Sequence, residues 1–486
     1  MFILSKRAWA VVMFLPFLFA CSTYNNKINA YYGAVKSNQL EQAQIQLNSN
    51  KFLQKKRNRL LYFLEQGKLL HLQKQYAKSN LFLNAADAII ENRLKNIGNV
   101  ILSNLTNPMA TDYKQEDFEI FMVHYYKALN YLQLGDVNEA VVEARRIGLS
   151  NNFQKDKYRF DSKKYTQDAF SLNLQGMLYE ANNEINNAFI SYRNAVDLYL
   201  NNGNNYYGTT IPNQLKKDVV RTANKLGFYD IADIYKQKLG NIETIDSTTS
   251  QSELIIFFEN GLAPTKQENN FVLTSGTGGS FFVTDAWGIR QNINMNGLVG
   301  NDKLSSIRTL RVAMPTYQIS TLNYPSNTVI IDNKIYTPTI IENLNQLSTS
   351  LLQERWLKEL TNAAVRQIAK KAVEKGTEKL SKSIAENNTK DTNKDGTKKT
   401  EEQKKKDKEK NEDIAEAMGF IVNMFNTVTE KADTRGWQTL PAFISYVRIP
   451  LNNGENNISL NSNGKTETIT INAKKGLQFY NFINWQ

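Results

Sequence analysis

The spacing of apolar residues changes along the chain and divides it into regions of different expected structure. In residues 28–240, apolar positions recur with the period of an α-helix. Residues 252–346 and 437–486 instead contain short apolar runs closed by Gly, Asn and Pro, which is typical of strands and turns. Residues 348–432 return to helical spacing. This order predicts an α+β protein with a helical domain at 21–240 and a β-rich domain at 252–486.

One stretch of the helical region fits the spacing of a tetratricopeptide repeat, a helix-turn-helix unit of 34 residues. Small residues at positions 8 and 20 of this unit let its two helices touch, and large residues fill the groove beside them. Copies of the same register put position 8 at Tyr31, Gly67, Ala128 and Val220. The packing residues of the clearest copy are Leu172, Gly176, Tyr179, Ala188, Tyr192 and Ala195.

The pattern therefore predicts a TPR-like α-solenoid, although a generic antiparallel bundle would place Ala and Gly in the same way. Stacked helix pairs bury faces that a single pair cannot bury alone. The concave surface of such a stack usually binds a peptide or a partner helix. This reading favours a protein-binding function for residues 21–240.

The β-rich region contains several turn signals. Ser275–Gly279 lies between two apolar runs and predicts a hairpin turn, because it lacks the Gly-Lys-Ser/Thr ending of a phosphate-binding loop. Pro315 within a strand-like run indicates a sheet edge or a bulge. Four apolar runs near the C-terminus predict an antiparallel meander with Asn-Gly at two of its turns: Phe443–Leu451, Asn457–Leu460, Thr466–Ile471 and Leu477–Ile483.

Two apolar stripes, at 352–372 and 414–428, predict a long helical hairpin over residues 348–432. The segment 386–411 between them is rich in lysine and has no apolar residue, so we expect a disordered tip. It contains no arginine or aromatic residue, which argues against nucleic-acid binding. A solvated loop is the simpler interpretation, and weak attraction to anionic lipid is the alternative.

The N-terminus predicts a secreted, lipid-anchored protein. Residues 1–20 carry Lys6 and Arg7 before a short apolar run that ends in Leu18-Phe19-Ala20-Cys21, as in a bacterial lipoprotein signal peptide. Cys21 is then the residue that receives the acyl chains. Ser22, rather than Asp, follows it, which points to the periplasmic face of the outer membrane.

Composition limits the chemistry. The 486 residues include one cysteine and two histidines, His71 and His124, and the formal net charge is +12. One cysteine forms no internal disulfide, and these three residues cannot build a structural zinc site. Catalysis by His or Cys is improbable for the same reason. We therefore expect no metal, no cofactor and no enzymatic activity.

The whole chain resembles a family of uncharacterised Gram-negative lipoproteins with tetratricopeptide repeats. Besides Cys21 and the repeats, the resemblance rests on three strings: Phe258–Pro264 (FENGLAP), Ala313–Tyr317 (AMPTY) and Asp433–Pro441 (DTRGWQTLP). It implies an envelope role and transfers no catalytic residue. Within the last string, Asp433, Arg435 and Trp437 form either a structural cluster or a ligand contact.

The leading hypothesis is an acyl-anchored, non-enzymatic scaffold that binds an envelope protein partner through its repeat groove. The alternatives are a structural subunit of an outer-membrane assembly, or an enzyme or cofactor of envelope polysaccharide or peptidoglycan metabolism. A scaffold should present an open groove lined by aromatic and Asn or Gln residues. An enzyme should present a cleft with convergent acids of perturbed pKa.

Overall fold

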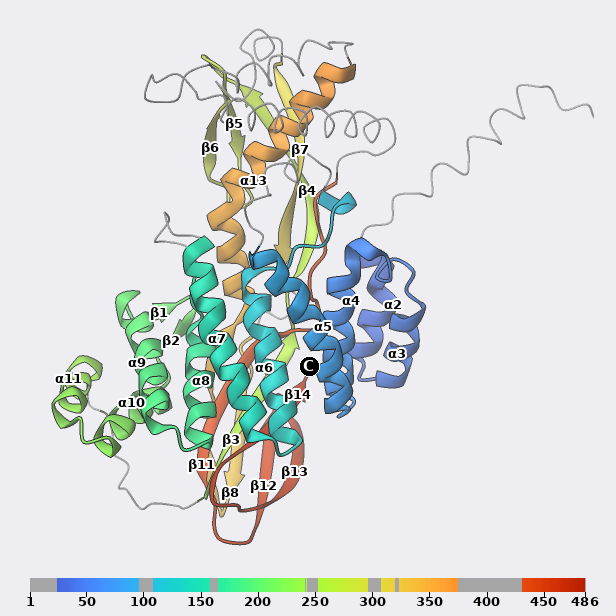
Figure 1. The fold of residues 1–486 in the computed structure, drawn as a ribbon. Coiled ribbons are helices and arrows are strands. Elements are labelled where there is room, and N and C mark those ends of the chain that lie inside the picture. Colours follow the sequence, from blue (N-terminus) through green and yellow to red (C-terminus); the bar gives the residue numbers. More distant parts are fainter. Residues whose placement is uncertain are drawn as a thin grey trace, which may run out of the picture.

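The computed structural model describes residues 24–95, 108–157, 165–240, 242, 252–295, 307–319, 323–374 and 431–485. Four predicted features lie outside these residues: the signal peptide 1–20, Cys21, the tip 386–411 and the second helical stripe 414–428. The fold is α+β, with a helical N-terminal region followed by sheets (Figure 1). None of the described helices combines the length and apolarity that crossing a bilayer requires.

Five antiparallel helix pairs follow one another in the described N-terminal region. Each turn within a pair has a residue with positive φ two positions before the second helix: Asn38, Lys74, Gly135, Asn183 and Gly227. The repetition of this left-handed residue indicates one repeated helix-turn-helix unit. The pairs are α2 Tyr24–Lys36 and α3 Leu40–Ser49, α4 Arg59–Leu72 and α5 Tyr76–Lys95, α6 Asp117–Gln133 and α7 Val137–Lys157, α8 Ala169–Ala181 and α9 Ile185–Asn201, and α10 Asn213–Lys225 and α11 Tyr229–Leu239.

The small residue at position 8 has a different neighbour from the one the sequence predicted. We expected Gly176 to face Ala188, but the atoms nearest to a Cβ built at Gly176 belong to the buried ring of Tyr192, at less than 3.0 Å. Gly67 faces Leu83 in the same way in the second pair. Leu172, Tyr179, Ala188 and Ala195 are buried, as their register requires.

The strands form three four-stranded sheets and one short hairpin. Their orders are β10-β11-β3-β14, here called the central sheet, β13-β12-β8-β9 and β6-β5-β4-β7. The strands are β1 Asn205–Tyr206, β2 Thr209–Thr210, β3 Ser252–Leu262, β4 Thr265–Ser275, β5 Ser280–Thr284, β6 Arg290–Asn294, β7 Thr309–Gln318, β8 Asn327–Ile331, β9 Lys334–Tyr336, β10 Thr339–Asn343, β11 Pro441–Pro450, β12 Glu455–Ser462, β13 Lys465–Asn472 and β14 Gly476–Asn484.

The predicted C-terminal meander is wrong. Only β12 and β13 form a hairpin, around Asn463-Gly464, and β14 instead pairs in parallel with β3 from Gly476↔Ser252 to Asn484↔Asn260. The physical reason is that β14 packs on both faces, with Phe482 in one apolar cluster and Phe479 in another. A strand with apolar contacts on both sides belongs between two layers rather than at the edge of an exposed hairpin.

Two other turn and strand predictions are confirmed. Ser275–Gly279 connects β4 to β5, which pair at Ser275↔Phe281. Pro315 lies in β7, an edge strand of its sheet. An edge position tolerates proline because the missing N–H is not needed for a second neighbour.

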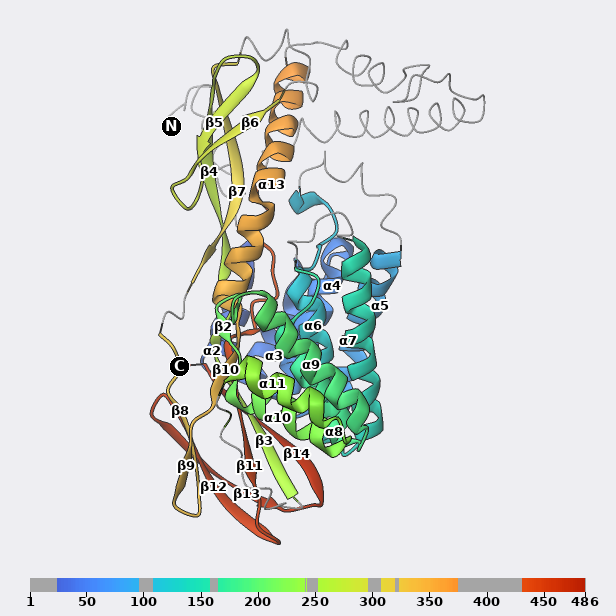
Figure 2. The same ribbon diagram turned by 90° about the vertical axis from the view of Figure 1, so that its left-hand side faces the viewer.

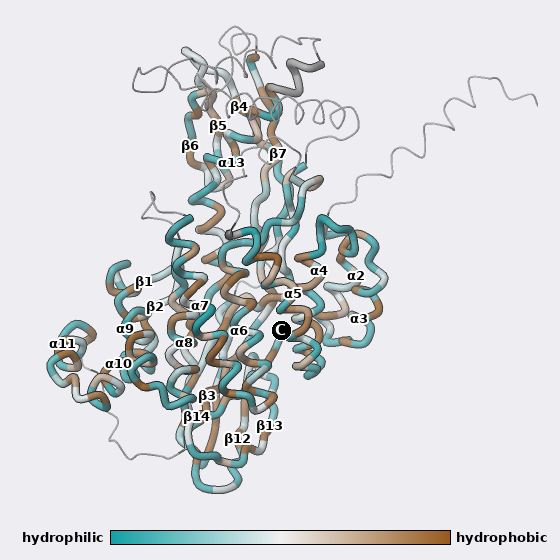
Figure 3. The backbone as a smooth tube through the Cα atoms, viewed as in Figure 1, coloured by the Kyte–Doolittle hydropathy of each residue, from teal (hydrophilic) through white to brown (hydrophobic). Residues whose placement is uncertain are grey.

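Strand β3 is buried on both faces. Ile255 and Phe257 pack into the core of the helical region, whereas Ile256 and Phe258 pack against the second sheet. Hydrophobic stretches along β3 are visible in Figure 3. The helical region and the central sheet therefore share one hydrophobic core.

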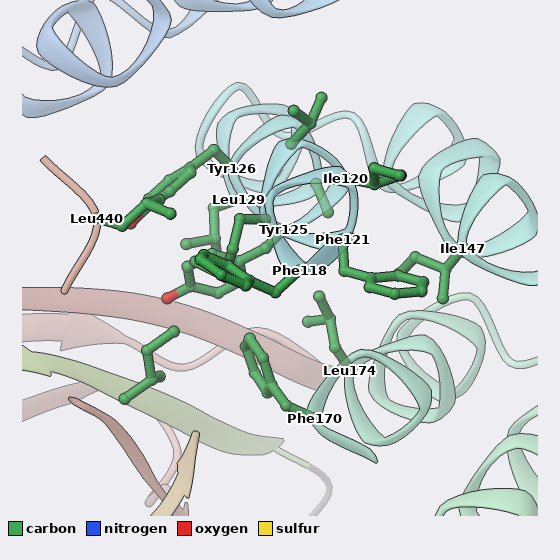
Figure 4. Packing of buried hydrophobic residues seen from close by; sticks show 14 of the residues in the cluster. Phe118, Ile120, Phe121, Tyr125, Tyr126, Leu129, Ile147, Phe170, Leu174 and Leu440 are labelled. Atoms are coloured by element: carbon green, nitrogen blue, oxygen red, sulfur yellow. The ribbon is translucent and has the colours of Figure 1, made fainter. Parts of the chain in front are cut away.

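The first helices of the pairs, α4, α6 and α8, pack next to one another and face the central sheet. Tyr125 from α6 and Phe170 from α8 both contact Phe257, with ring centroids 5.7 and 6.3 Å apart. Figure 4 shows Tyr125 and Phe170 between the helices and the strands. The inner face of the repeats at α6 and α8 is thus occupied by the chain's own sheet.

A second lobe extends away from this core. Helix α13 (Leu344–Glu374), the described part of the predicted helical hairpin, runs along the sheet β6-β5-β4-β7 (Figure 2). Trp356 and Leu360 from α13 pack on Leu273, Val312 and Met314 from the sheet. This lobe has its own apolar cluster, separate from the core of the repeats.

Replacing Gly176 with alanine should destabilise the protein by about 1–3 kcal/mol, because the added methyl group overlaps the fully buried ring of Tyr192. Thermal unfolding followed by circular dichroism measures this effect. The matched control is Gly33→Ala in α2, where a Cβ meets nothing within 4 Å. That change should stabilise by about 0.5–1 kcal/mol, and equal melting temperatures for both variants would contradict the packing described here.

Candidate functional site

A buried ion pair joins the repeats to the central sheet. Lys68 Nζ in α4 lies 2.6 Å from Glu259 Oε2 in β3, and both side chains are fully buried. Tyr126 donates to the same carboxylate oxygen, and Tyr125 and Asn481 donate to the other. Burial alone would raise the pKa of Glu259, but the charge of Lys68 and these hydrogen bonds hold it below its ordinary value. Glu259 belongs to the FENGLAP string, so that string has a structural role at this interface.

The predicted cluster of Asp433, Arg435 and Trp437 is also part of this interface. Arg435 is fully buried, and all five of its N–H donors have acceptors: both carboxylate oxygens of Asp433, the side-chain oxygen of Asn58, and the carbonyls of Thr111 and Pro108. The Trp437 ring lies 5.8 Å from that of Tyr126. No donor of Arg435 remains for a ligand, so the structural interpretation of this cluster fits the contacts.

Two buried acids that the sequence analysis missed hold the same segment. Glu65 accepts hydrogen bonds from the Gln438 N–H and the Thr439 hydroxyl, and Glu119 accepts from the Trp437 N–H. Burial raises the pKa of each carboxyl to about 7, against the effect of these hydrogen bonds. The only sequence signal for them was the presence of acids within apolar helical stretches.

One group of side chains has the composition of a metal site. Asp87, His124 and Glu143 bring their ligand atoms within 4.8 Å of one another. However, Lys127 Nζ lies 2.8 Å from both carboxylates, and Arg146 lies 2.9 Å from Asp87. These cations balance the acids, so the group is accounted for as a buried ion-pair network.

An open groove lies at the N-terminal end of the repeats, between α3, α4 and the start of α5. Its volume is about 530 Å³. Gln44 and Asn48 from α3, Gln66 from α4, and Gln73 and Gln75 from the following turn give it five amide side chains. Tyr62, Phe82, Leu70 and Ile45 supply apolar surface, and Glu41 and Lys78 contribute one charge of each sign.

Hydrogen bonds among the amides orient the floor of this groove. Gln66 donates to Asn48 and to the Tyr62 hydroxyl, and Gln44 donates to Gln66, over 2.7, 3.0 and 3.0 Å. Gln66 is 2% exposed. The Gln44 side-chain oxygen is buried and has no hydrogen-bond partner among the described residues.

An open groove lined by aromatic and amide side chains was expected from the sequence, but its position in the chain was not predicted. The repeat register fits best at 172–195, but the first helix of that repeat, α8, faces the central sheet. The sequence signal for the position of this groove was the series Tyr62, Gln66 and Leu70, spaced by four residues on one face of α4.

Comparison with known proteins identifies no family. The chain matches no family model, and no curated protein sequence is similar to it. Among solved structures, the apo form of RapI is similar at 13% identity and a TM-score of 0.32, over 48% of this chain and 58% of that chain. A likeness this weak supports no argument, and the resemblance to a lipoprotein family stays a prediction.

A pair of buried acids lies elsewhere in the interface. Asp168, at the N-terminus of α8, accepts hydrogen bonds from the Ser171 N–H and hydroxyl and also from Glu342 in β10. Burial and the neighbouring carboxylate of Asp168 raise the pKa of Glu342 well above its ordinary value, and burial raises the pKa of Asp168 as well, so the two carboxyls titrate as a pair. Glu116 is the opposite case: although burial raises its pKa, Arg355 and Lys266 lower it to about 2.

Breaking the buried pair should cost much of the stability. We expect Glu259→Gln to lower the free energy of unfolding by about 3–5 kcal/mol, because Lys68 keeps a buried charge without a counter-charge. Lys68→Met/Glu259→Gln should cost clearly less than the sum of the single changes, as measured by denaturant unfolding. Lys236→Met, which removes the exposed pair with Asp233, is the control and should change little. Additive single and double effects would show that the pair is not coupled.

The two buried acids Glu342 and Glu116 should give pH dependences of opposite sign. A raised folded-state pKa means that stability is lost as pH rises above the ordinary value of 4.5. Glu342→Gln removes this loss, so its melting temperature should increase relative to the parent as pH rises from 4.5. Glu116→Gln should be most destabilising near neutral pH and less so as pH falls toward 2. Parallel pH profiles for the parent and Glu342→Gln would contradict the raised pKa of Glu342.

Proposed function

We propose that this protein is a non-enzymatic scaffold of the Gram-negative cell envelope, held on the outer membrane by an acyl chain on Cys21. Its partner is a protein that places an extended segment in the amide-lined groove of α3, α4 and α5. The observation that carries this proposal is the openness of that groove, in contrast to the inner face at α6 and α8, which the central sheet covers.

The composition of the groove suits a peptide backbone. Each Asn or Gln amide provides both donors and an acceptor, which is also the complement of a peptide group. Gln44 lines the groove and donates to Gln66, so its amide orients the polar surface that a partner would meet. Tyr62 and Phe82 add apolar surface to the groove, which the side chains of the bound segment can contact. Such a surface recognises an extended chain largely through its main-chain groups.

The positions of the perturbed acids support a binding role. Glu65, Glu119 and Glu342, whose pKa values are raised by burial, each have 6% exposure or less and lie in the interface with the sheet. None of them lines the groove. Catalytic acids need contact with substrate in a cleft, and these three carboxyls are instead hydrogen-bonded to buried groups of the chain itself.

An anchor at Cys21 would hold the groove close to the membrane. Helix α2 begins at Tyr24, three positions after Cys21. Three residues of fully extended chain span at most about 11 Å, so the first repeat would lie near the lipid surface. We therefore propose a partner that is itself at or in the outer membrane.

A photo-crosslinking amino acid at Ile45 tests the groove in intact cells. Ile45 lines the groove and is 60% exposed, so the probe should form a specific adduct with one envelope protein. Gln44→Leu should reduce that adduct about fivefold, because it removes an amide that lines the groove and orients Gln66, with the loss of about one hydrogen bond of ordinary strength. The same probe at Ile335, which is 68% exposed on β9, is the matched control and should give no such adduct.

Two results would contradict the proposal. An adduct of equal yield from Ile45 and Ile335 would show that capture does not depend on the groove. Persistence of the protein in the membrane fraction after Cys21→Ser would exclude the acyl anchor. The two readouts are independent, so the groove and the anchor are tested separately.

A further inference from the structure

A second cavity lies in the lobe formed by α13 and the sheet β6-β5-β4-β7, far from the groove in sequence. Its volume is about 440 Å³. Strands β4 and β7, the turn after β5 and the first half of α13 contribute its walls. Five of its nine lining residues carry an amide or a hydroxyl group: Asn269, Asn270, Thr316, Tyr317 and Thr349.

Aromatic rings form one side of this cavity and are held in place from behind. Phe271 and Trp287 line it, and Trp356, which is 1% exposed, contacts both from the core, with centroid distances of 5.4 and 6.0 Å. The turn that carries Trp287 is fixed by Asp285, whose carboxylate accepts the N–H groups of Trp287 and Ile289. The aromatic side is therefore preformed.

The cavity is lined by neutral residues only. Lys266 lies 5.8 Å from the Tyr317 ring, but Lys266 and the neighbouring Arg355 are both already paired with Glu116. A phosphate or carboxylate would find no counter-charge among the described lining residues, and such groups usually need one. A lipid chain would offer no hydrogen bond to the polar lining, in which Asn269 donates to Thr316 and Thr349 donates to the Asn345 carbonyl, but the Asn270 side chain has no partner among the described residues.

We propose that this cavity binds a neutral saccharide. Each sugar hydroxyl both donates and accepts hydrogen bonds, as the Asn, Thr and Tyr side chains do. The C–H face of a pyranose ring matches the electron-rich face of an indole or phenyl ring. The lining contains no carboxylate, whereas glycoside hydrolysis commonly uses two. The cavity would therefore hold a glycan without cleaving it, and this inference does not depend on the proposed protein-binding groove.

Within the lining, Trp287 and Asn270 make the sharpest tests. Trp287 is the aromatic residue at the turn, so its removal takes away a stacking surface. Asn270 is exposed, and its side-chain amide has no partner among the described residues, so its removal breaks no internal hydrogen bond. Both changes act on the cavity without removing a buried core residue.

The experiment is a calorimetric titration of purified full-length chain carrying Cys21→Ser with three neutral trisaccharides: chitotriose, cellotriose and maltotriose. We expect saturable binding of at least one sugar. Trp287→Ala should weaken that binding about fivefold or more, and Trp287→Phe should restore part of it. Asn270→Ala should weaken it about threefold, and Ile335→Ala on β9 should leave it unchanged.

Two outcomes would overturn the assignment. One is the absence of binding for all three sugars up to about 10 mM, a range that covers weak millimolar affinity. The other is sugar binding that both Trp287→Ala and Asn270→Ala leave unchanged while melting temperatures remain normal, because the sugar would then occupy another site.

Discussion

The structure depends on one constraint: β3 is an apolar strand buried on both faces, yet it carries Glu259. A buried carboxylate without partners costs several kcal/mol. The helices supply the counter-charge of this acid, the ammonium of Lys68, and the hydroxyls of Tyr125 and Tyr126, and Asn481 of β14 adds one more donor. The requirement to satisfy Glu259 therefore fixes where α4 and α6 lie on the sheet. Apolar contacts such as Tyr125 with Phe257 stabilise this arrangement but would tolerate a shifted register.

This docking determines which surfaces remain for binding. The repeats bury their inner face at α6 and α8 against the central sheet, so a partner has no access to it there. The two surfaces proposed for binding lie elsewhere: the groove at α3, α4 and α5, and the cavity beside α13. Glu116, at the start of α6, pairs with Lys266 of β4 and Arg355 of α13, and so joins the second lobe to the repeats. The buried ion pairs therefore hold the parts of the chain that carry these surfaces against the same helices.

The local sequence pattern predicted most helices and tight turns correctly, but it did not predict which strands pair or which helices meet. The repeat register located residues that are buried in the structure, because the small position 8 and the large position 24 are required within one helix pair. Turn chemistry predicted the hairpins at 275–279 and 463–464, because positive φ is a local demand. The parallel pairing of β14 with β3 was missed, because it joins strands more than 200 residues apart and depends on burial of both faces. The roles of Glu65 and Glu119 and the position of the groove were missed for the same reason, because each depends on contacts between segments that are distant in the sequence.

The buried acids of the interface change stability with pH in opposite directions. This contrast indicates which structural role they have. Glu65 and Glu119, with pKa values raised by burial to about 7, cost stability as pH rises from 4.5 to 7, whereas Glu116, lowered to about 2, contributes stability as pH rises from 2 to 4.5. Taken alone, these three acids would give a maximum near pH 4.5. Apolar side chains at 65 and 119 would avoid the cost at neutral pH. They could not, however, accept the N–H groups of Trp437 and Gln438, whose burial would then be unsatisfied. The acids are therefore best understood as the groups that place segment 431–440 in a single position on the helices, at some expense of stability.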